Sequence, residues 1–327
     1  MILSIIIPTY NSEKTIIRAI DSCCIESING IEVVVIDDGS QDKTIDIIKR
    51  KYSQYISSQK IKLISADHEG AGNARNIGIN NAIGKWIIFL DSDDKFKDIK
   101  AVIEDLKSFE DKTFDILNYS VNYMQSFNSS ENMFHGKDLI KDNLGLVNEK
   151  IKLWDSGPAY KIFNRNFLEE NNIEFPIDIK IGEDLVFNQK CLQTDANVLV
   201  KSGDIYEVID NEDSITHTIV KQDILDDGVR LTNLVQNFNI PFEFKQMFIA
   251  KNFISILVRF LKSYYSINDV ITSLKQYKCS FNIEKTGQIF LRLRDNLNIP
   301  IVLVSWMIWG NPNILKVLFP IMKKIKY

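Results

Sequence analysis

Residues 85–96 read KWIIFLDSDDKF, an apolar run that stops abruptly at a short acidic stretch. The run from Trp86 to Leu90 has no polar interruption, which is typical of a strand buried on both faces in a parallel sheet. Asp91, Asp93 and Asp94 follow it directly. Ligands of open parallel sheets bind just beyond the carboxyl ends of the strands. The stretch therefore predicts a binding site where this strand ends.

The spacing of Asp91 and Asp93 suits a divalent metal ion. In extended backbone, residues two positions apart point to the same side, so the two carboxylates would converge. Carboxylate oxygens are the hard ligands that Mg2+ and Mn2+ prefer, and such an ion usually keeps open positions for substrate phosphates. An ordinary acidic turn is the alternative, because Asp and Ser are frequent turn residues.

Three similar apolar runs precede this stretch, at residues 3–7, 31–36 and 61–65. Each is followed by a polar loop and then by apolar residues at helical spacing. This alternation predicts an α/β fold, Rossmann-like, with a mostly parallel sheet and helices on both faces. Because every polar loop follows a strand end, its side chains should gather at one edge of the sheet. They include Tyr10, Asp38, His68, Asp91 and Asp93.

The composition is that of an ordinary globular protein, with 45% hydrophobic and 25% charged residues among 327. The formal net charge is -4, so the chain does not show the excess of basic residues that is typical of a nucleic-acid-binding protein. The four cysteines show neither zinc-ligand spacing nor a secreted disulfide framework. Met1 leads into the first strand without the basic flank of a signal peptide. We therefore expect a cytoplasmic protein with no nucleic-acid partner.

Three segments occur in a characteristic order: IIIPTYN at 5–11, VVVIDDGSQDKT at 33–44 and EGAGNARNIGINNAIGKWIIFLDSDD at 69–94. In this order and spacing, the first 100 residues closely resemble the family 2 glycosyltransferases, which have the GT-A fold. That family makes glycosidic bonds from nucleotide-activated sugars, mostly UDP-sugars, with a divalent metal at its D-x-D motif. The resemblance implies a hexosyl- or N-acetylhexosaminyltransferase that uses Mn2+ or Mg2+.

The resemblance implies a nucleobase pocket at the ends of the first strands. Pro8, which removes a ladder donor and should end the first strand, and Tyr10 would line this pocket. Asp38 would accept the hydrogen bond of the uracil N3–H group. His68 stands where family members often have Asn, so it either contacts the nucleotide as a neutral imidazole or is a solvated loop residue.

The diphosphate and the metal would lie next to the acidic stretch. The resemblance implies that Asp93 binds the metal directly and that Asp91 contacts the ribose or the water shell of the metal. Ser92, between them, belongs to the same sugar-donor site. Arg75 would lie near the base or the diphosphate, where its charge would favour phosphate. The alternative for Arg75 is a surface position on an amphipathic helix.

A second cluster carries the acceptor chemistry. Glu183 and Asp184 precede apolar residues at helical spacing, where acids also favour a helix N-terminus. The family has a Glu-Asp pair here, after a stretch like residues 161–165, and its Asp is the general base. We therefore predict that Asp184 takes the proton of the acceptor hydroxyl in a direct, inverting displacement. Glu183 would bind the acceptor or orient the base, and Trp154 would stack on an acceptor sugar or lie in the core.

The pattern divides the chain into a catalytic domain at 1–220 and a helical region at 221–327. Within the catalytic domain we expect a nucleotide-binding half at 1–100 and an acceptor half at 101–220. Residues 211–218 (NEDSITHT) resemble the flexible loop that follows the last strand in the family.

The last 29 residues, 299–327, contain no acid and four lysines. Trp306 and Trp309 lie in their apolar stretch, which is too short to span a bilayer. Apolar surface with aromatic and basic neighbours suits peripheral contact with an anionic membrane at its cytoplasmic face. The alternative is a helical subdomain that packs on the catalytic domain or on a second copy of the chain.

These observations predict an inverting, metal-dependent glycosyltransferase that extends a glycan or a lipid-linked acceptor in bacterial surface polysaccharide synthesis. A sugar nucleotidyltransferase is a second hypothesis, but the first strand leads into PTYN instead of a glycine-rich phosphate loop. A nucleotide-sugar-binding scaffold with a decayed site is a third, although every motif acid is present. No motif identifies the sugar, the acceptor, the linkage or the oligomeric state.

Overall fold

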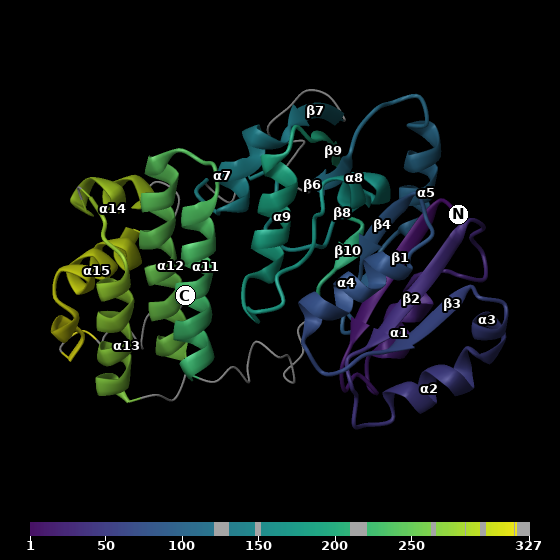
Figure 1. The fold of residues 1–327 in the computed structure, drawn as a ribbon, viewed down its shortest axis with the longest axis horizontal. Helices are drawn as coiled ribbons and strands as arrows, with labels where there is room; N and C mark the ends of the chain where they lie inside the picture. Colours follow the sequence, from purple (N-terminus) through teal and green to yellow (C-terminus); the bar gives the residue numbers. More distant parts are fainter. Residues whose placement is uncertain are drawn as a thin grey trace. The chain divides into compact units, whose positions relative to one another are not determined.

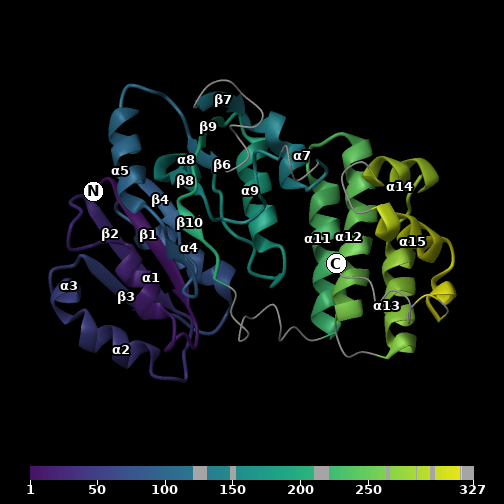
Figure 2. The same cartoon turned by 180° about the vertical axis from the view of Figure 1, so that it is seen from behind.

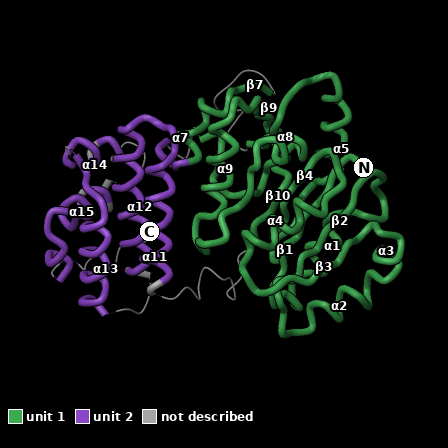
Figure 3. The backbone as a smooth tube through the Cα atoms, viewed as in Figure 1, with its two compact units in different colours: residues 1–143, 151–212 green, residues 144–150, 213–327 purple. Residues whose placement is uncertain are grey.

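The computed structural model describes residues 1–120, 131–147, 152–209, 221–262, 266–284, 286–294, 299–316 and 318. The chain forms two compact units (Figure 3). The first unit consists of residues 1–143 and 151–212, and the second of residues 144–150 and 213–327.

The first unit is built on an eight-stranded mixed sheet with the order β3-β2-β1-β4-β8-β6-β9-β7 (Figure 1). Its parallel half contains β1 (Leu3–Thr9), β2 (Ile31–Asp37), β3 (Ile61–Ser65) and β4 (Trp86–Phe89). These are the four strands predicted from the apolar runs. β1, β2 and β4 are buried at every residue, as expected for strands covered on both faces.

The other half of the sheet mixes strand directions. β8 (Lys161–Asn164) runs antiparallel to both β4 and β6 (Ile116–Ser120). β9 (Asn197–Ser202) is parallel to β6, and β7 (Glu131–His135) is antiparallel to β9. Residues 114–124 alternate between apolar and polar side chains, which is typical of a half-buried strand, but β6 is buried throughout because it lies between two other strands.

Helices cover both faces of the parallel half (Figures 1 and 2). α1 (Ile16–Ser22) and α5 (Ile99–Ser108) share a core with the β1 residues Ile5 and Ile7. α4 (Ala71–Asn81) packs on the opposite face, where a Cβ at Gly78 would lie 2.3 Å from Ile6 Cγ2. The described residues of this unit also form α2 (Thr44–Lys51), α3 (Ser53–Ser57), η1 (Gly136–Leu139), α7 (Ile140–Asn143), α8 (Arg165–Glu170) and α9 (Glu183–Gln193).

The second unit is helical, as predicted. Its elements are α11 (Lys221–Asn237), α12 (Phe242–Lys262), α13 (Ile267–Ser280), α14 (Thr286–Arg294), α15 (Ile299–Gly310) and η2 (Pro312–Ile314). α15 packs on α12 and α14, and its residues Ile308 and Trp309 are buried while Trp306 and Met307 are exposed. Among the described residues, no helix combines the length and the apolar character that crossing a bilayer requires.

Candidate functional site

The carboxyl ends of the parallel strands lie at one edge of the sheet. The ladder pairs Thr9 at the end of β1 with Asp37 at the end of β2, and Asp38 N donates to the Thr9 carbonyl at 2.9 Å. Leu90, directly after β4, donates to the Ile6 carbonyl of β1. The predicted loops therefore meet at this edge. Pro8 lies inside β1, which continues to Thr9, so the prediction that it ends the strand is wrong.

Asp38 organises one end of this edge. Its buried carboxylate accepts hydrogen bonds from the backbone of Glu69 (Oδ1, 3.0 Å) and of Gly70 (Oδ2, 3.0 Å). His68 Nδ1 lies 3.1 Å from Asp38 Oδ2 and 2.9 Å from the Asp38 carbonyl oxygen. Both partners are acceptors, so Nδ1 carries the proton. The His68 ring stacks on Tyr10 with centroids 4.2 Å apart, which brings the predicted nucleobase residues together.

Residues 91–94 form a turn, closed by the hydrogen bond from Asp94 N to the Asp91 carbonyl at 3.1 Å. The extended backbone expected for Asp91 and Asp93 is therefore wrong, because the strand ends at Phe89. The Ser12 and Ser92 hydroxyls are 2.8 Å apart and hold the turn against the loop after β1. Burial raises the pKa of Asp93, and the nearby charge of Asp91 adds to the shift. A cation between the two carboxylates would relieve this repulsion.

Asp94 and Tyr206 hold the turn at residues 91–94 in place through hydrogen bonds. The Tyr206 hydroxyl accepts from Asp91 N at 3.1 Å and donates to Asp94 Oδ2 at 2.9 Å. Asp94 Oδ1 accepts from Ile209 N at 2.8 Å. Tyr206 comes from β10 (Tyr206–Glu207), which pairs with β5 (Lys95–Phe96). Sequence reasoning missed this tyrosine, because its only local signal was the strand pattern around it.

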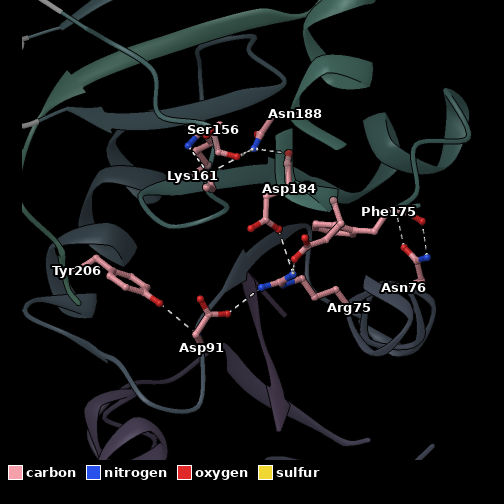
Figure 4. Close-up of polar contacts among 11 residues, drawn as sticks. Arg75, Asn76, Asp91, Ser156, Lys161, Phe175, Asp184, Asn188 and Tyr206 are labelled. Atoms are coloured by element: carbon pink, nitrogen blue, oxygen red, sulfur yellow. Dashed lines mark hydrogen bonds and ion pairs between the residues drawn. The ribbon is translucent and has the colours of Figure 1, made fainter. Parts of the chain in front are cut away.

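Arg75 is buried in the middle of the site (Figure 4). Its Nη2 lies 2.9 Å from Asp91 Oδ1, and its Nη1 lies 3.1 Å from Glu183 Oε1 and 3.0 Å from Asp184 Oδ1. Burial alone would lower the pKa of Arg75, but these carboxylates reverse the effect and raise it. The alternative of an exposed arginine on an amphipathic helix is therefore wrong.

Glu183 and Asp184 form the first turn of α9, which starts after Gly182 at a φ of 91°. Only a glycine adopts that backbone conformation without strain. Burial raises the pKa of Asp184 well above the ordinary value of a carboxyl group, although Arg75 opposes the shift. The side chain is still 24% exposed, so a ligand has access to it. A carboxylate with a raised pKa and solvent access is suited to accept a proton.

Trp154 is 1% exposed, so it occupies the core position that the sequence also allowed. Its ring packs against the Lys161 ammonium, with the nitrogen 4.7 Å from the ring centre. In this structure the indole therefore offers no open face on which a sugar could stack. Sequence reasoning assigned no role at the site to Lys161 or Asn188, which lie beside Asp184 in Figure 4.

The chemistry of the turn fits a metal that arrives with a phosphate ligand. Among the described residues, no group of three or more His, Cys, Asp or Glu side chains is arranged to hold a metal by itself. Asp91 and Asp93 supply carboxylates, and Mg2+ is commonly held by one or two carboxylates together with substrate phosphates. The predicted loop at 211–218 lies outside the described residues.

Comparisons with known proteins show the family of the chain. Residues 4–171, just over half of the chain, match the family described as Glycosyl transferase family 2. Poly(ribitol-phosphate) beta-N-acetylglucosaminyltransferase TarS of Staphylococcus aureus (strain MW2) is 31% identical over 209 residues, 63% of this chain and 35% of that protein. Poly(ribitol-phosphate) beta-glucosyltransferase of Bacillus spizizenii is 32% identical over 192 residues, 57% of this chain and 29% of that protein. The chain thus spans about a third of the length of these relatives.

A solved structure extends the likeness to nearly the whole chain. The crystal structure of S. aureus TarS 1-349 in complex with UDP-GlcNAc matches with a TM-score of 0.64 and 21% identity. The match covers 95% of this chain and 92% of that chain. It shows a shared fold and confirms the predicted GT-A architecture with its helical C-terminal region.

Proposed function

Because the chain belongs to glycosyl transferase family 2, we propose that it moves a sugar from a UDP-activated donor to a hydroxyl of a glycan or lipid-linked acceptor, with inversion. The observation that carries the proposal is the Arg75 cluster. It joins Asp91, next to the predicted metal site, to Asp184, the predicted base. The printed names of the relatives, an N-acetylglucosaminyltransferase and a glucosyltransferase, support a hexose or N-acetylhexosamine as the transferred group.

The Asp38 carboxylate has the capacity to bind a uracil. Two carboxylate oxygens offer about four acceptor positions. Backbone and His68 hydrogen bonds use one position on Oδ1 and two on Oδ2. One position on Oδ1 is left for the uracil N3–H group. Tyr10 is covered by His68 on one ring face, so the base would stack on its other face, beside Pro8.

We assign the proton transfer to Asp184. Its carboxylate takes the proton of the acceptor hydroxyl as that oxygen bonds to C1 of the sugar, and the bond from C1 to the diphosphate oxygen breaks. A single base and a direct displacement invert the anomeric centre. Glu183 shares the Arg75 guanidinium with the base and orients it or binds the acceptor. Mn2+ or Mg2+ held by Asp93 and Asp91 would supply positive charge for the departing diphosphate.

Residues 1–100 would form the nucleotide-binding half of the catalytic domain and residues 101–220 the acceptor half. In the helical region, Trp306 and Met307 are 40% and 48% exposed on α15. We propose that this face, with the lysines that follow it, contacts the cytoplasmic face of an anionic membrane, where lipid-linked acceptors in surface polysaccharide synthesis are found. Co-sedimentation with anionic but not with neutral vesicles tests this contact, and self-association without vesicle binding would favour a second copy of the chain instead.

The function is tested by incubating the purified protein with Mn2+ or Mg2+ and a panel of UDP-, GDP- and dTDP-sugars. UDP-GlcNAc and UDP-glucose are included, with poly(ribitol phosphate) as one acceptor probe. We expect one UDP-sugar to raise the melting temperature and to release UDP, and EDTA to abolish both effects. Binding without transfer or hydrolysis would favour a scaffold. Pyrophosphate formed from UTP and a sugar phosphate would favour a nucleotidyltransferase.

A further inference from the structure

Lys161 is fully buried at the start of β8, an uncommon environment for a lysine. Its Nζ donates hydrogen bonds to the carbonyls of Gly157 at 2.6 Å and Ala159 at 3.3 Å. Burial lowers the pKa of Lys161 to about 8, so the ammonium is still the main form at neutral pH. The backbone before β8 therefore folds around one buried positive charge.

Asn188 holds the same segment from helix α9. Its buried Nδ2 donates to the Ser156 carbonyl at 2.8 Å and also lies 3.3 Å from the Gly157 carbonyl. The same amide nitrogen is 3.0 Å from the carbonyl of Asp184, one helical turn earlier (Figure 4). The Gly157 carbonyl is thus shared by Asn188 and Lys161. These bonds tie residues 156–159 to the helical turn that presents Asp184.

The segment also has an open side. Ser156, Gly157 and Ala159 are all partly exposed. A Cβ built on Gly157 would meet no atom within 4 Å. The space beside this backbone is therefore available to a ligand. Two buried polar side chains, Lys161 and Asn188, hold the backbone that borders this space.

We propose that Lys161 is a positioning residue for the acceptor, and that residues 156–159 form the wall against which the acceptor hydroxyl is aligned beside Asp184. This inference rests on the proposed function. Lys161 does not touch the reacting atoms and acts through the segment that it holds. Without its ammonium the carbonyls of Gly157 and Ala159 lose a donor, and the segment loses its fixed geometry. Misplacement of a reacting group by about 1 Å can cost about 100-fold in rate.

The test compares Lys161→Met with the control Lys190→Met. Methionine keeps an unbranched apolar stem and removes the charge. Lys190 is a matched control because it lies on α9 and donates to one backbone carbonyl, that of Glu174, at 2.7 Å. UDP-GlcNAc and poly(ribitol phosphate) serve as donor and acceptor probes. We expect Lys161→Met to raise the acceptor KM by about tenfold or more. UDP binding and the slow hydrolysis of UDP-GlcNAc without acceptor should change less than about twofold, and Lys190→Met should match the wild type.

A second variant keeps the inference testable if Lys161→Met fails to fold. Gly157→Leu leaves Lys161 in place and puts a side chain into the open space, so it should raise the same KM without affecting hydrolysis. An unchanged acceptor KM in the folded variants would overturn the inference, as would an equal fall in transfer and hydrolysis. A wild-type protein that neither transfers nor hydrolyses any UDP-sugar would instead refute the proposed function, so the two failures are distinct.

Discussion

Arg75 Nη1 lies 3.0 Å from Asp184 Oδ1, although 109 positions separate the two residues in the chain. The same guanidinium also reaches Glu183 and Asp91, so one buried cation partly neutralises three carboxylates. Arg75 belongs to α4, which follows β3, whereas Asp184 belongs to α9 in the other half of the sheet domain. This contact fixes the distance between the proposed base and the turn that carries Asp93.

Replacing Arg75 by methionine should damage both stability and activity. The change leaves Asp91, Glu183 and Asp184 close together without their shared cation. Removing one partner of a buried ion pair typically costs about 3–5 kcal/mol of stability. Transfer should fall by about 100-fold or more, because the base loses its fixed position. Denaturant unfolding measures the first effect and initial transfer rates measure the second.

Two further variants separate charge from geometry at this position. Arg75→Lys keeps the charge but loses the planar fork that contacts several carboxylates at once, so it should be more stable than Arg75→Met yet still poorly active. Arg50→Met, at an exposed position on α2, should behave like the wild type. Full activity in Arg75→Lys would show that the fork does not position the base.

Asp184→Asn should abolish most transfer while the protein still binds the sugar nucleotide. The amide has the shape of the carboxylate but cannot accept the proton, and loss of general base catalysis typically costs about 100- to 10,000-fold. Asp195→Asn is the control, because Asp195 is 92% exposed and pairs with a surface lysine, Lys137. Wild-type turnover in Asp184→Asn would remove this residue from the role of base.

The raised pKa of Asp184 makes two further outcomes testable. Activity should fall as the pH drops through this pKa, and the acid limb should lie above the ordinary carboxyl value of about 4. Between the unfolded and the folded pKa, the folded state binds more protons, so stability decreases as the pH rises. Where the pH lies above this raised pKa, the ionised Asp184 therefore costs stability, and Asp184→Asn should melt there at the same temperature as the wild type or higher. A melting temperature clearly below the wild type would contradict this reasoning.

Much of the fold was predictable because its signals are local. The apolar runs at 3–7, 31–36, 61–65 and 86–90 identify buried strands without knowledge of their partners. Their order predicts the parallel half of the sheet and the edge at which the polar loops meet. β6 was predicted less well, because its Asn118 is buried in the structure and satisfied by the distant Leu153 carbonyl. Burial of a polar residue by a long-range partner leaves no local pattern.

The site shows the same division between local and long-range information. Asp91, Asp93 and Asp184 follow motifs, so their positions could be predicted from the sequence. The bridge made by Arg75 could not be predicted, because it depends on how α4 and α9 pack. The role of Tyr206 could not be predicted either, because its hydroxyl bonds to Asp94, which lies 112 positions earlier in the chain.

Asp93→Ala should remove the metal dependence of nucleotide binding. If Asp93 holds the ion that bridges to the diphosphate, UDP with Mn2+ should stabilise the wild type by thermal shift and leave Asp93→Ala unchanged. EDTA should reduce the wild-type response to that of the variant. Asp111→Ala, at an exposed position after α5, should keep the full response. A metal-dependent shift that persists in Asp93→Ala would exclude this carboxylate as a required ligand.

Tyr206→Phe should weaken the turn that carries the proposed metal ligands. The hydroxyl accepts from Asp91 N and donates to Asp94 Oδ2, so its removal leaves two polar groups without that partner. We expect a loss of about 1–3 kcal/mol in the free energy of unfolding, together with weaker binding of UDP in the presence of Mn2+. Tyr55→Phe is the matched control, because its hydroxyl also bonds a carboxylate, that of Glu26, but at an exposed site. Equal stability losses in the two variants would mean that the buried bridge contributes no more than a surface hydrogen bond. If only Tyr206→Phe loses stability and it also binds UDP more weakly, the pairing of β5 with β10 supports the turn that carries the proposed metal ligands.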